Sequence, residues 1–205
     1  MTNCKEILIL TDNIFLAQRF EKLVWPKVDS TLYKLSFGCS PCSEIDKFDL
    51  FFPITSINLK KTEHIETLLK KDLIISLHCK QLFPLKLLNN VRCINIHPGY
   101  NPTTRGWFPH VFAIINDLEI GVTIHEIDEK LDHGKIIIRE KVDKYNHDTS
   151  LTLYNRIIEK EIELLTLHIN SIIENSYTLI QPECGGNIFL EKDFINLCKL
   201  NLEKK

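Results

Sequence analysis

The stretch Ile94-Asn95-Ile96-His97-Pro98-Gly99-Tyr100 determines the interpretation of the whole sequence. Its apolar residues are typical of a buried β-strand, and Pro98-Gly99 ends that strand. Side chains two positions apart on a strand point to the same side, so Asn95 and His97 present an amide and an imidazole together. In open α/β sheets, ligands bind at the carboxyl ends of strands. An amide donor beside an imidazole suits a reaction that makes an oxyanion and moves a proton. The structural alternative is a polar pair that caps a strand end.

The sequence before this stretch alternates between strand and helix patterns. We expect strands at residues 6–10, 31–37, 49–54, 72–77 and 92–97, and helices at 14–20 and 62–71. Such alternation predicts a Rossmann-like α/β fold, with a mainly parallel sheet flanked by helices. No GxGxxG motif follows the first strand, so a dinucleotide ligand is not supported.

The sequence after this stretch contains a second group of elements. A helix is predicted for residues 105–115, capped by Thr103 or Thr104. Strands at 119–127, expected to be half-exposed, and at 135–142 form a C-terminal β-hairpin or its crossed variant, and a long amphipathic helix follows at 150–176. We therefore divide the chain into a catalytic domain, residues 1–180, and a short tail, residues 181–205.

Composition narrows the range of partners and locations. The 205 residues carry a formal net charge of -2, which argues against nucleic acid as the main partner. The seven cysteines are scattered, and the single CxxC motif at residues 39–42 is a weak metal or redox signal, so a reducing, cytoplasmic setting fits best. No signal peptide is recognisable and no apolar run is long enough for membrane insertion.

Three segments with chemically useful residues each follow a predicted strand or precede one. They are Asn95-x-His97, Asp132-His133-Gly134-Lys135 before an apolar strand, and His78-Cys79-Lys80-Gln81 after the fourth strand. If their strands are parallel neighbours, the three segments meet at one edge of the sheet.

These motifs carry a resemblance to a known family. The order Asn95-Ile-His-Pro, an Arg105-Gly loop, Gly-Val-Thr-Ile-His and Asp132-x-Gly-x-Ile-Ile resembles the 10-formyltetrahydrofolate-dependent formyltransferases. The sequence from Asn95 to Pro109 is a more specific motif, and it is similar to that of sugar N-formyltransferases acting on dTDP-4-amino-4,6-dideoxyglucose. The resemblance covers roughly residues 5–175.

The resemblance implies roles for particular residues. The catalytic asparagine, histidine and aspartate of the family fall on Asn95, His97 and Asp132, and no metal is implied. Asn95 would donate to the oxyanion and His97 would move the amine proton, while Asp132 would orient His97 and pass protons to the leaving nitrogen. The formyl donor, 10-formyltetrahydrofolate, is expected at Lys80, Gln81, Leu82, Phe83 and Asp128.

Contacts to the dTDP-amino sugar substrate are predicted for a further set of residues, which comprises Asn13, His78, Tyr100, Arg105 and Trp107. Arg105 is the best phosphate partner by charge. Asn13 also fits a helix N-cap, which is the favoured interpretation. Lys80 and Gln81 are alternative contacts to the sugar or the diphosphate.

Several departures and alternatives remain at this stage. Gly99-Tyr100-Asn101-Pro102 replaces the Ser-Leu-Leu-Pro of enzymes acting on glycinamide ribonucleotide or tRNA, and no basic C-terminal domain follows. The tail is shorter than in the sugar enzymes, as in a shortened variant or a truncated chain. The resemblance implies a homodimer and a role in O-antigen synthesis. Alternatives are another amine acceptor, a non-catalytic sugar-nucleotide-binding protein, and a metal hydrolase using His97, His125 and Asp132.

Overall fold

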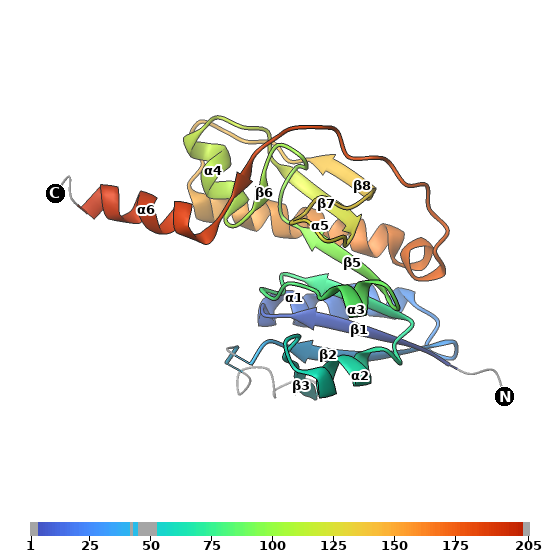
Figure 1. Ribbon diagram of the computed structural model, residues 1–205. Coiled ribbons are helices and arrows are strands. Elements are labelled where there is room, and N and C mark those ends of the chain that lie inside the picture. Colours follow the sequence, from blue (N-terminus) through green and yellow to red (C-terminus); the bar gives the residue numbers. More distant parts are fainter. Residues whose placement is uncertain (1–3, 42, 45–52, 203–205) are drawn as a thin grey trace.

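The computed structural model describes residues 4–41, 43–44 and 53–202, and its centre is a seven-stranded sheet in the order β3-β2-β1-β4-β5-β7-β8 (Figure 1). The strands are β1 (Lys5–Thr11), β2 (Tyr33–Cys39), β3 (Ile54–Ser56), β4 (Leu73–Leu77), β5 (Arg92–His97), β7 (Gly121–Glu126) and β8 (Ile136–Lys141). The first five run parallel, whereas β7 is antiparallel to both of its neighbours. This arrangement confirms the predicted Rossmann-like sheet and the C-terminal hairpin.

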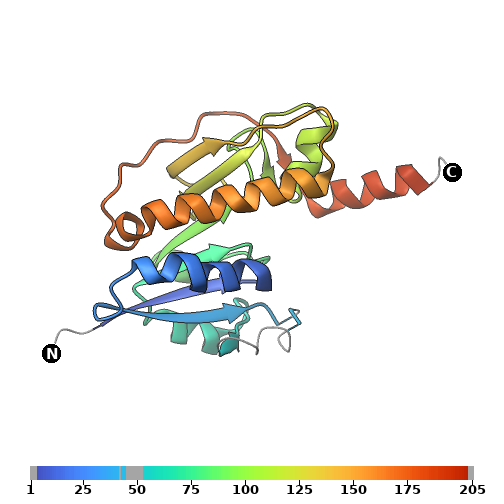
Figure 2. The ribbon, with the colours of Figure 1, turned by 180° about the vertical axis from the view of Figure 1, so that it is seen from behind.

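Helices cover both faces of the sheet. The α-helices of the described residues are α1 (Ile14–Arg19), α2 (Thr62–Leu68), α3 (Leu85–Leu88), α4 (Pro109–Ile115), α5 (Ser150–Glu174) and α6 (Glu191–Leu202). The helices α1 and α5 lie on one face (Figure 2), and α2 and α3 lie on the other (Figure 1). After α1 the chain continues through a π-helical turn, Phe20–Val24, and a 3₁₀ turn, Trp25–Lys27.

Burial on both faces explains the strand sequences. All five residues of β4, Leu-Ile-Ile-Ser-Leu, are buried, as are five of the seven in β1. A strand covered by helices on both sides has no solvent face, so its sequence is continuously apolar rather than alternating. Two hydrophobic clusters result, one between the sheet and α1 and α5, and one between the sheet and α2 and α3.

Strand register places the polar residues. Ser76 pairs with Asn95 and Leu77 with Ile96, so β4 and β5 end side by side. On the other side of β5, Asn95 pairs with His125 of β7. The pairing therefore brings the ends of three strands together at the position where the sequence predicts a site.

The predicted helix at 105–115 begins too early. Arg105–Gly106 instead forms a short strand, β6, that runs parallel to β9 (Ile188–Phe189), and α4 begins only at Pro109. Phe108 has a left-handed backbone, with φ of 48°, so Thr103 and Thr104 do not cap this helix. The local helical periodicity was overridden by pairing with a segment more than 80 residues away in sequence, Arg105 with Ile188.

Two strand predictions also differ from the structure. The third strand begins at Ile54, after Pro53, and the part of the prediction at residues 49–52 lies outside the described residues. The strand β7 is buried on both faces rather than half-exposed. Its polar face is covered by the loop after β5, where the Thr123 hydroxyl donates to the Gly99 carbonyl and accepts from the Asn101 amide.

The C-terminal segment forms structure that the sequence did not predict. Phe189 of β9 stacks on Phe112 at 4.1 Å, and Phe194 of α6 contacts Phe108 at the same centroid distance. The helix α6 then extends away from the sheet (Figure 1). Among the described residues, no helix is both long and apolar enough to cross a bilayer.

Candidate active site

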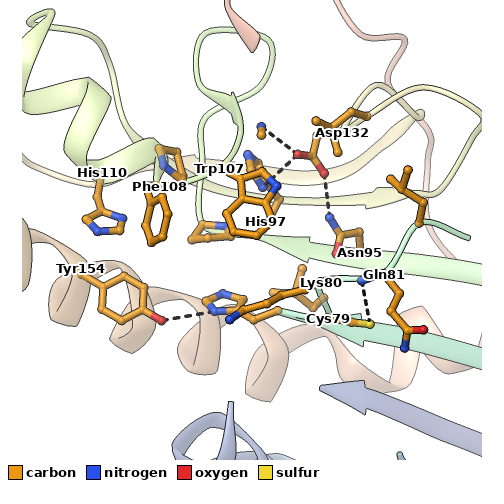
Figure 3. Close-up of a pocket in the computed structure, with 17 residues that line it drawn as sticks. Cys79, Lys80, Gln81, Asn95, His97, Trp107, Phe108, His110, Asp132 and Tyr154 are labelled. Atoms are coloured by element: carbon orange, nitrogen blue, oxygen red, sulfur yellow. Dashed lines mark hydrogen bonds and ion pairs between the residues drawn. The ribbon is translucent and has the colours of Figure 1, made fainter. Parts of the chain in front are cut away.

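A cavity of about 430 Å³ lies beyond the ends of β4 and β5 (Figure 3). Its walls come from five segments of the sequence. These are residues 78–82 after β4, residues 95–98 at the end of β5, residues 106–110 before and in α4, residues 131–132 in the loop before β8, and Tyr154 of α5. The cavity therefore lies at the edge of the sheet where an open α/β fold binds ligands.

Asp132 and Asn95 meet at one end of this cavity. The Asn95 amide nitrogen donates to Asp132 Oδ1 at 2.9 Å, and the backbone amide of Gly106 donates to Oδ2 at 2.9 Å. Burial favours the neutral acid, but His97, His125 and the Gly106 amide together hold the pKa of Asp132 well below its usual range. The carboxylate is therefore a fixed negative charge inside the protein.

His97 lies beside this carboxylate and is almost fully buried. Its Nε2 is 2.8 Å from the Thr104 carbonyl, which can only accept, so Nε2 carries the hydrogen. Nδ1 then has a free lone pair and lies 3.5 Å from Asp132 Oδ2. Burial lowers the pKa of His97 below its ordinary 6.5, despite the attraction of Asp132, so the imidazole is neutral near pH 7 and can act as a base.

Gly99 allows this geometry. A Cβ at position 99 would collide with the Thr104 carbonyl oxygen and with the His97 ring. The glycine in the Pro98-Gly99 pair therefore does more than end the strand: it lets the loop fold back onto the imidazole and fix its tautomer.

His125 is the third side chain at Asp132. Its Nδ1 donates to the Glu126 carbonyl at 2.7 Å, and its Nε2 lies 3.3 Å from Asn95 Nδ2 and 3.5 Å from Asp132 Oδ1. The contact to Asn95 is long enough for an incoming ligand oxygen to compete for that amide hydrogen. Within the described part of the chain, no group of three or more His, Cys, Asp or Glu is arranged to hold a metal ion.

A second cavity, of about 220 Å³, adjoins the first. It is lined by Phe83 and by the loop from Ile127 to Asp132, and it shares Asn95 and Asp132 with the larger cavity. Asp128 lies in this lining and accepts a 2.8 Å hydrogen bond from His133 Nδ1. Two spaces therefore meet at the same amide and carboxylate.

The structure brings most of the predicted ligand contacts to these cavities. His78, Lys80, Gln81, Leu82 and Trp107 line the larger one, and Gln81, Leu82, Phe83 and Asp128 line the smaller one. The Gln81 side chain bonds to backbone groups, the Ile57 carbonyl and the Leu59 amide, so it also braces the loop after β4.

The remaining predicted contacts lie elsewhere. Asn13 caps α1, as favoured from the sequence, by accepting from the Leu16 amide. The Tyr100 ring lies under the Arg139 guanidinium at 4.6 Å, and Arg105 donates to the Gly185 carbonyl at 3.0 Å. Asn13, Tyr100 and Arg105 do not line the larger cavity.

Several site residues were missed by sequence analysis. Asp12 accepts from the Lys80 amide at 2.9 Å and from Ser40, and thereby anchors the loop after β4. Tyr154 and His110 line the cavity on the side opposite Asn95 and Asp132 (Figure 3). The feature of the sequence that could have indicated Asp12 is its position just after the first predicted strand.

The site can now be assigned to a class of protein. A buried neutral base, an ionised carboxylate and an amide donor can move a proton and stabilise negative charge on an oxygen, which is the chemistry of a group-transfer enzyme with an open α/β fold. A sequence profile of the formyl transferase family matches residues 53–169, more than half of the chain. The chain belongs to the formyl transferase family, and it is an enzyme of the one-carbon transferase class.

Individual relatives agree with this assignment. The chain is 40% identical over 199 residues to a dTDP-4-amino-4,6-dideoxyglucose formyltransferase of Mycobacterium bovis, covering 97% of this chain and 80% of the relative. A solved sugar N-formyltransferase from a Shewanella species is 37% identical with a TM-score of 0.89, over 95% of this chain and 80% of that one. A 4-N formyltransferase from Francisella tularensis is 43% identical with a TM-score of 0.86, over 95% and 79%. The expected fold and family are confirmed.

Proposed function

We propose that this enzyme transfers the formyl group of 10-formyltetrahydrofolate to the 4-amine of a dTDP-linked 4-amino-4,6-dideoxy sugar. The identity to the mycobacterial relative and the similarity to sugar N-formyltransferases support this substrate class. We further propose a role in surface polysaccharide (O-antigen) synthesis, a cytoplasmic location and a homodimer, as expected from the sequence.

The observation that carries the proposal is the junction of two cavities at Asn95 and Asp132. A transfer between two substrates needs both reacting atoms at one point, with each substrate in its own space. The smaller cavity, with Phe83 and the loop at Asp128, fits the formyl donor, because an aromatic ring and polar loop groups suit a flat heterocycle with amide edges. The larger cavity, with Trp107, Phe108 and Tyr154, fits the sugar nucleotide.

The residues at the junction then have distinct tasks. When bound, 10-formyltetrahydrofolate supplies a formyl carbon that the sugar amine can attack, so no protein nucleophile is required. Asn95 donates an amide hydrogen to the formyl oxygen as it gains negative charge. His97 Nδ1 takes the proton from the attacking nitrogen, and Asp132 stabilises the imidazolium that results. That proton then goes to the leaving nitrogen as its bond to the formyl carbon breaks.

The proposal is tested by incubating the purified protein with dTDP-4-amino-4,6-dideoxyglucose and 10-formyltetrahydrofolate. We expect tetrahydrofolate to form together with a sugar nucleotide heavier by one formyl group. His97→Ala should lower kcat by about 100- to 10,000-fold, the usual contribution of a general base. His147→Ala is the matched control, since this exposed histidine stacks on Tyr145 away from the site. A wild-type protein that binds neither substrate in calorimetry would overturn the proposal.

The pH dependence of kcat/KM gives a separate prediction. His97 must be neutral to accept a proton, and protonation at low pH removes the base. Because the pKa of His97 is lowered from 6.5, the imidazole stays neutral to a more acidic pH than an exposed histidine would. We expect the acidic limb of the kcat/KM profile to be centred below pH 6.5. Because the acceptor amine must also be neutral to attack, kcat at saturating substrate is recorded beside kcat/KM, and an acidic limb centred above pH 6.5 in both profiles would contradict the assignment of His97 as the base.

A further inference from the structure

Glu161 is a charged residue in an apolar position of α5. Its side chain is 0% exposed and follows Ile157 and Ile158 on the buried side of the helix. Burying a carboxylate costs several kcal/mol unless it is well paired, and an apolar residue at such a site often gives equal or greater stability. Glu161 therefore does not contribute to folding in the way that its neighbours do.

The polar partner of Glu161 is His78. Glu161 Oε1 lies 2.9 Å from His78 Nε2, and no hydrogen-bond partner is present for Glu161 Oε2 among the described residues. A carboxylate can only accept, so Nε2 carries a hydrogen, and with the ring hydrogen on Nε2 the Nδ1 atom is an acceptor. The Tyr154 hydroxyl lies 3.4 Å from that Nδ1. The buried carboxylate thus sets the direction of the hydrogen bond from Tyr154.

The fold builds this chain of contacts from two elements. Tyr154 and Glu161 are seven residues apart on α5, so they lie on the same stripe of the helix, two turns from each other. His78 follows the last residue of β4, with a left-handed φ of 59°, and its ring bridges them. Asn13 completes the chain by donating to the Tyr154 oxygen at 3.2 Å.

Only some of these hydrogen-bonded side chains face the cavity. His78 and Tyr154 line it, whereas Glu161 lies behind them and has no exposed surface. The Tyr154 hydroxyl hydrogen is committed to His78 and one oxygen lone pair to Asn13, so the oxygen presents one remaining acceptor position. Tyr154 lies on the side of the cavity opposite Asp132, beyond the rings of Trp107 and Phe108 (Figure 3).

We infer that Glu161 is a positioning residue that, through His78, holds the Tyr154 oxygen as an acceptor for a hydroxyl hydrogen of the acceptor sugar. This inference rests on the proposed function. The aromatic rings beside Tyr154 suit the apolar faces of a deoxysugar, and the fixed acceptor orients its polar edge. The hydrogen-bonded series Glu161–His78–Tyr154, called the relay below, would thus orient the sugar. Asn95, His97 and Asp132 act on the reacting atoms.

Glu161→Gln separates this role from a structural one. Glutamine has nearly the same shape but lacks the charge that fixes the His78 proton. We expect KM for the sugar nucleotide to rise about tenfold, with KM for the formyl donor changed less than about twofold. The melting temperature should not fall, because glutamine keeps an acceptor oxygen for His78 Nε2 while the cost of burying a charge is removed. Glu163→Gln, two residues away on the exposed side of the same helix, is the matched control.

Tyr154→Phe tests the same relay without touching the core. It removes only the hydroxyl and leaves the ring against His110. Alone it should also raise KM for the sugar nucleotide about tenfold. In the double variant with Glu161→Gln, it should raise KM for the sugar nucleotide by less than about a further threefold, because the two residues act through one hydrogen bond. If the two substitutions acted independently on the structure, their separate increases in KM would multiply in the double variant.

Binding of dTDP identifies the part of the substrate that the relay contacts. Calorimetry should show that Glu161→Gln weakens dTDP-4-amino-4,6-dideoxyglucose about tenfold but leaves dTDP alone unchanged. Equal weakening of both ligands would overturn the assignment to the sugar. If the wild-type protein is active and Glu161→Gln has the same kcat and KM values, the positioning role of Glu161 is overturned while the proposed function stands. A wild-type protein that neither binds nor formylates the sugar nucleotide would overturn the proposed function, and the inference with it.

Discussion

Asp132→Asn is expected to lower kcat by roughly a thousandfold, because it removes the charge that stabilises the His97 imidazolium. The substitution also disturbs the local hydrogen bonds. Asp132 accepts from two fixed donors, Asn95 Nδ2 and the Gly106 amide. An asparagine has one acceptor oxygen, so its NH₂ group must face one of these donors. We therefore expect a loss larger than that from removing a single hydrogen bond.

Asp117→Asn is the matched control for this experiment. Asp117 and Asp132 both have a left-handed backbone, with φ of 51° and 45°, but the Asp117 side chain is 96% exposed and pairs with Lys144. Initial rates of tetrahydrofolate formation under saturating substrates measure both variants. The control should keep wild-type kcat. If Asp132→Asn kept kcat within about tenfold of wild type, a charge-stabilising role for Asp132 would be excluded.

Gly106→Ala is expected to reduce both stability and activity. Gly106 has a φ of 91°, and a Cβ there would collide with the backbone carbonyl of Phe189 in β9. Backbone strain of this kind costs about 1–3 kcal/mol, and the displacement of β9 adds to it. The Gly106 amide also donates to Asp132 Oδ2, so its movement should lower kcat by about tenfold or more.

Gly185→Ala isolates the contribution of strain. Gly185 has nearly the same φ, 92°, but a Cβ there meets nothing within 4 Å. Urea unfolding should show a free energy of unfolding at least about 2 kcal/mol lower for Gly106→Ala than for Gly185→Ala. The control should retain wild-type kcat. Equal losses in the two variants would mean that contact with β9 does not position the Gly106 amide.

The local sequence determined where the chemistry lies along the chain. The alternation of strand and helix patterns before residue 97 predicted a mainly parallel sheet with helices on both faces. The alternation in Asn95-Ile96-His97 placed an amide and an imidazole on one side of a strand, since the side-chain period of a strand is two. These features depend on neighbouring residues, so sequence patterns report them.

The tertiary structure decided what those side chains contact. The burial of β7 on both faces, the pairing of β6 with β9, and the contacts of Asp132 with Gly106 all depend on segments distant in sequence. Glu161 escaped notice because a single polar residue hardly changes the apolar periodicity of a 25-residue helix. Its partner, His78, lies 83 residues earlier and meets it only when β4 and α5 pack together. Local patterns fix the direction of a side chain, whereas its partner, its protonation and its burial arise from how the elements assemble.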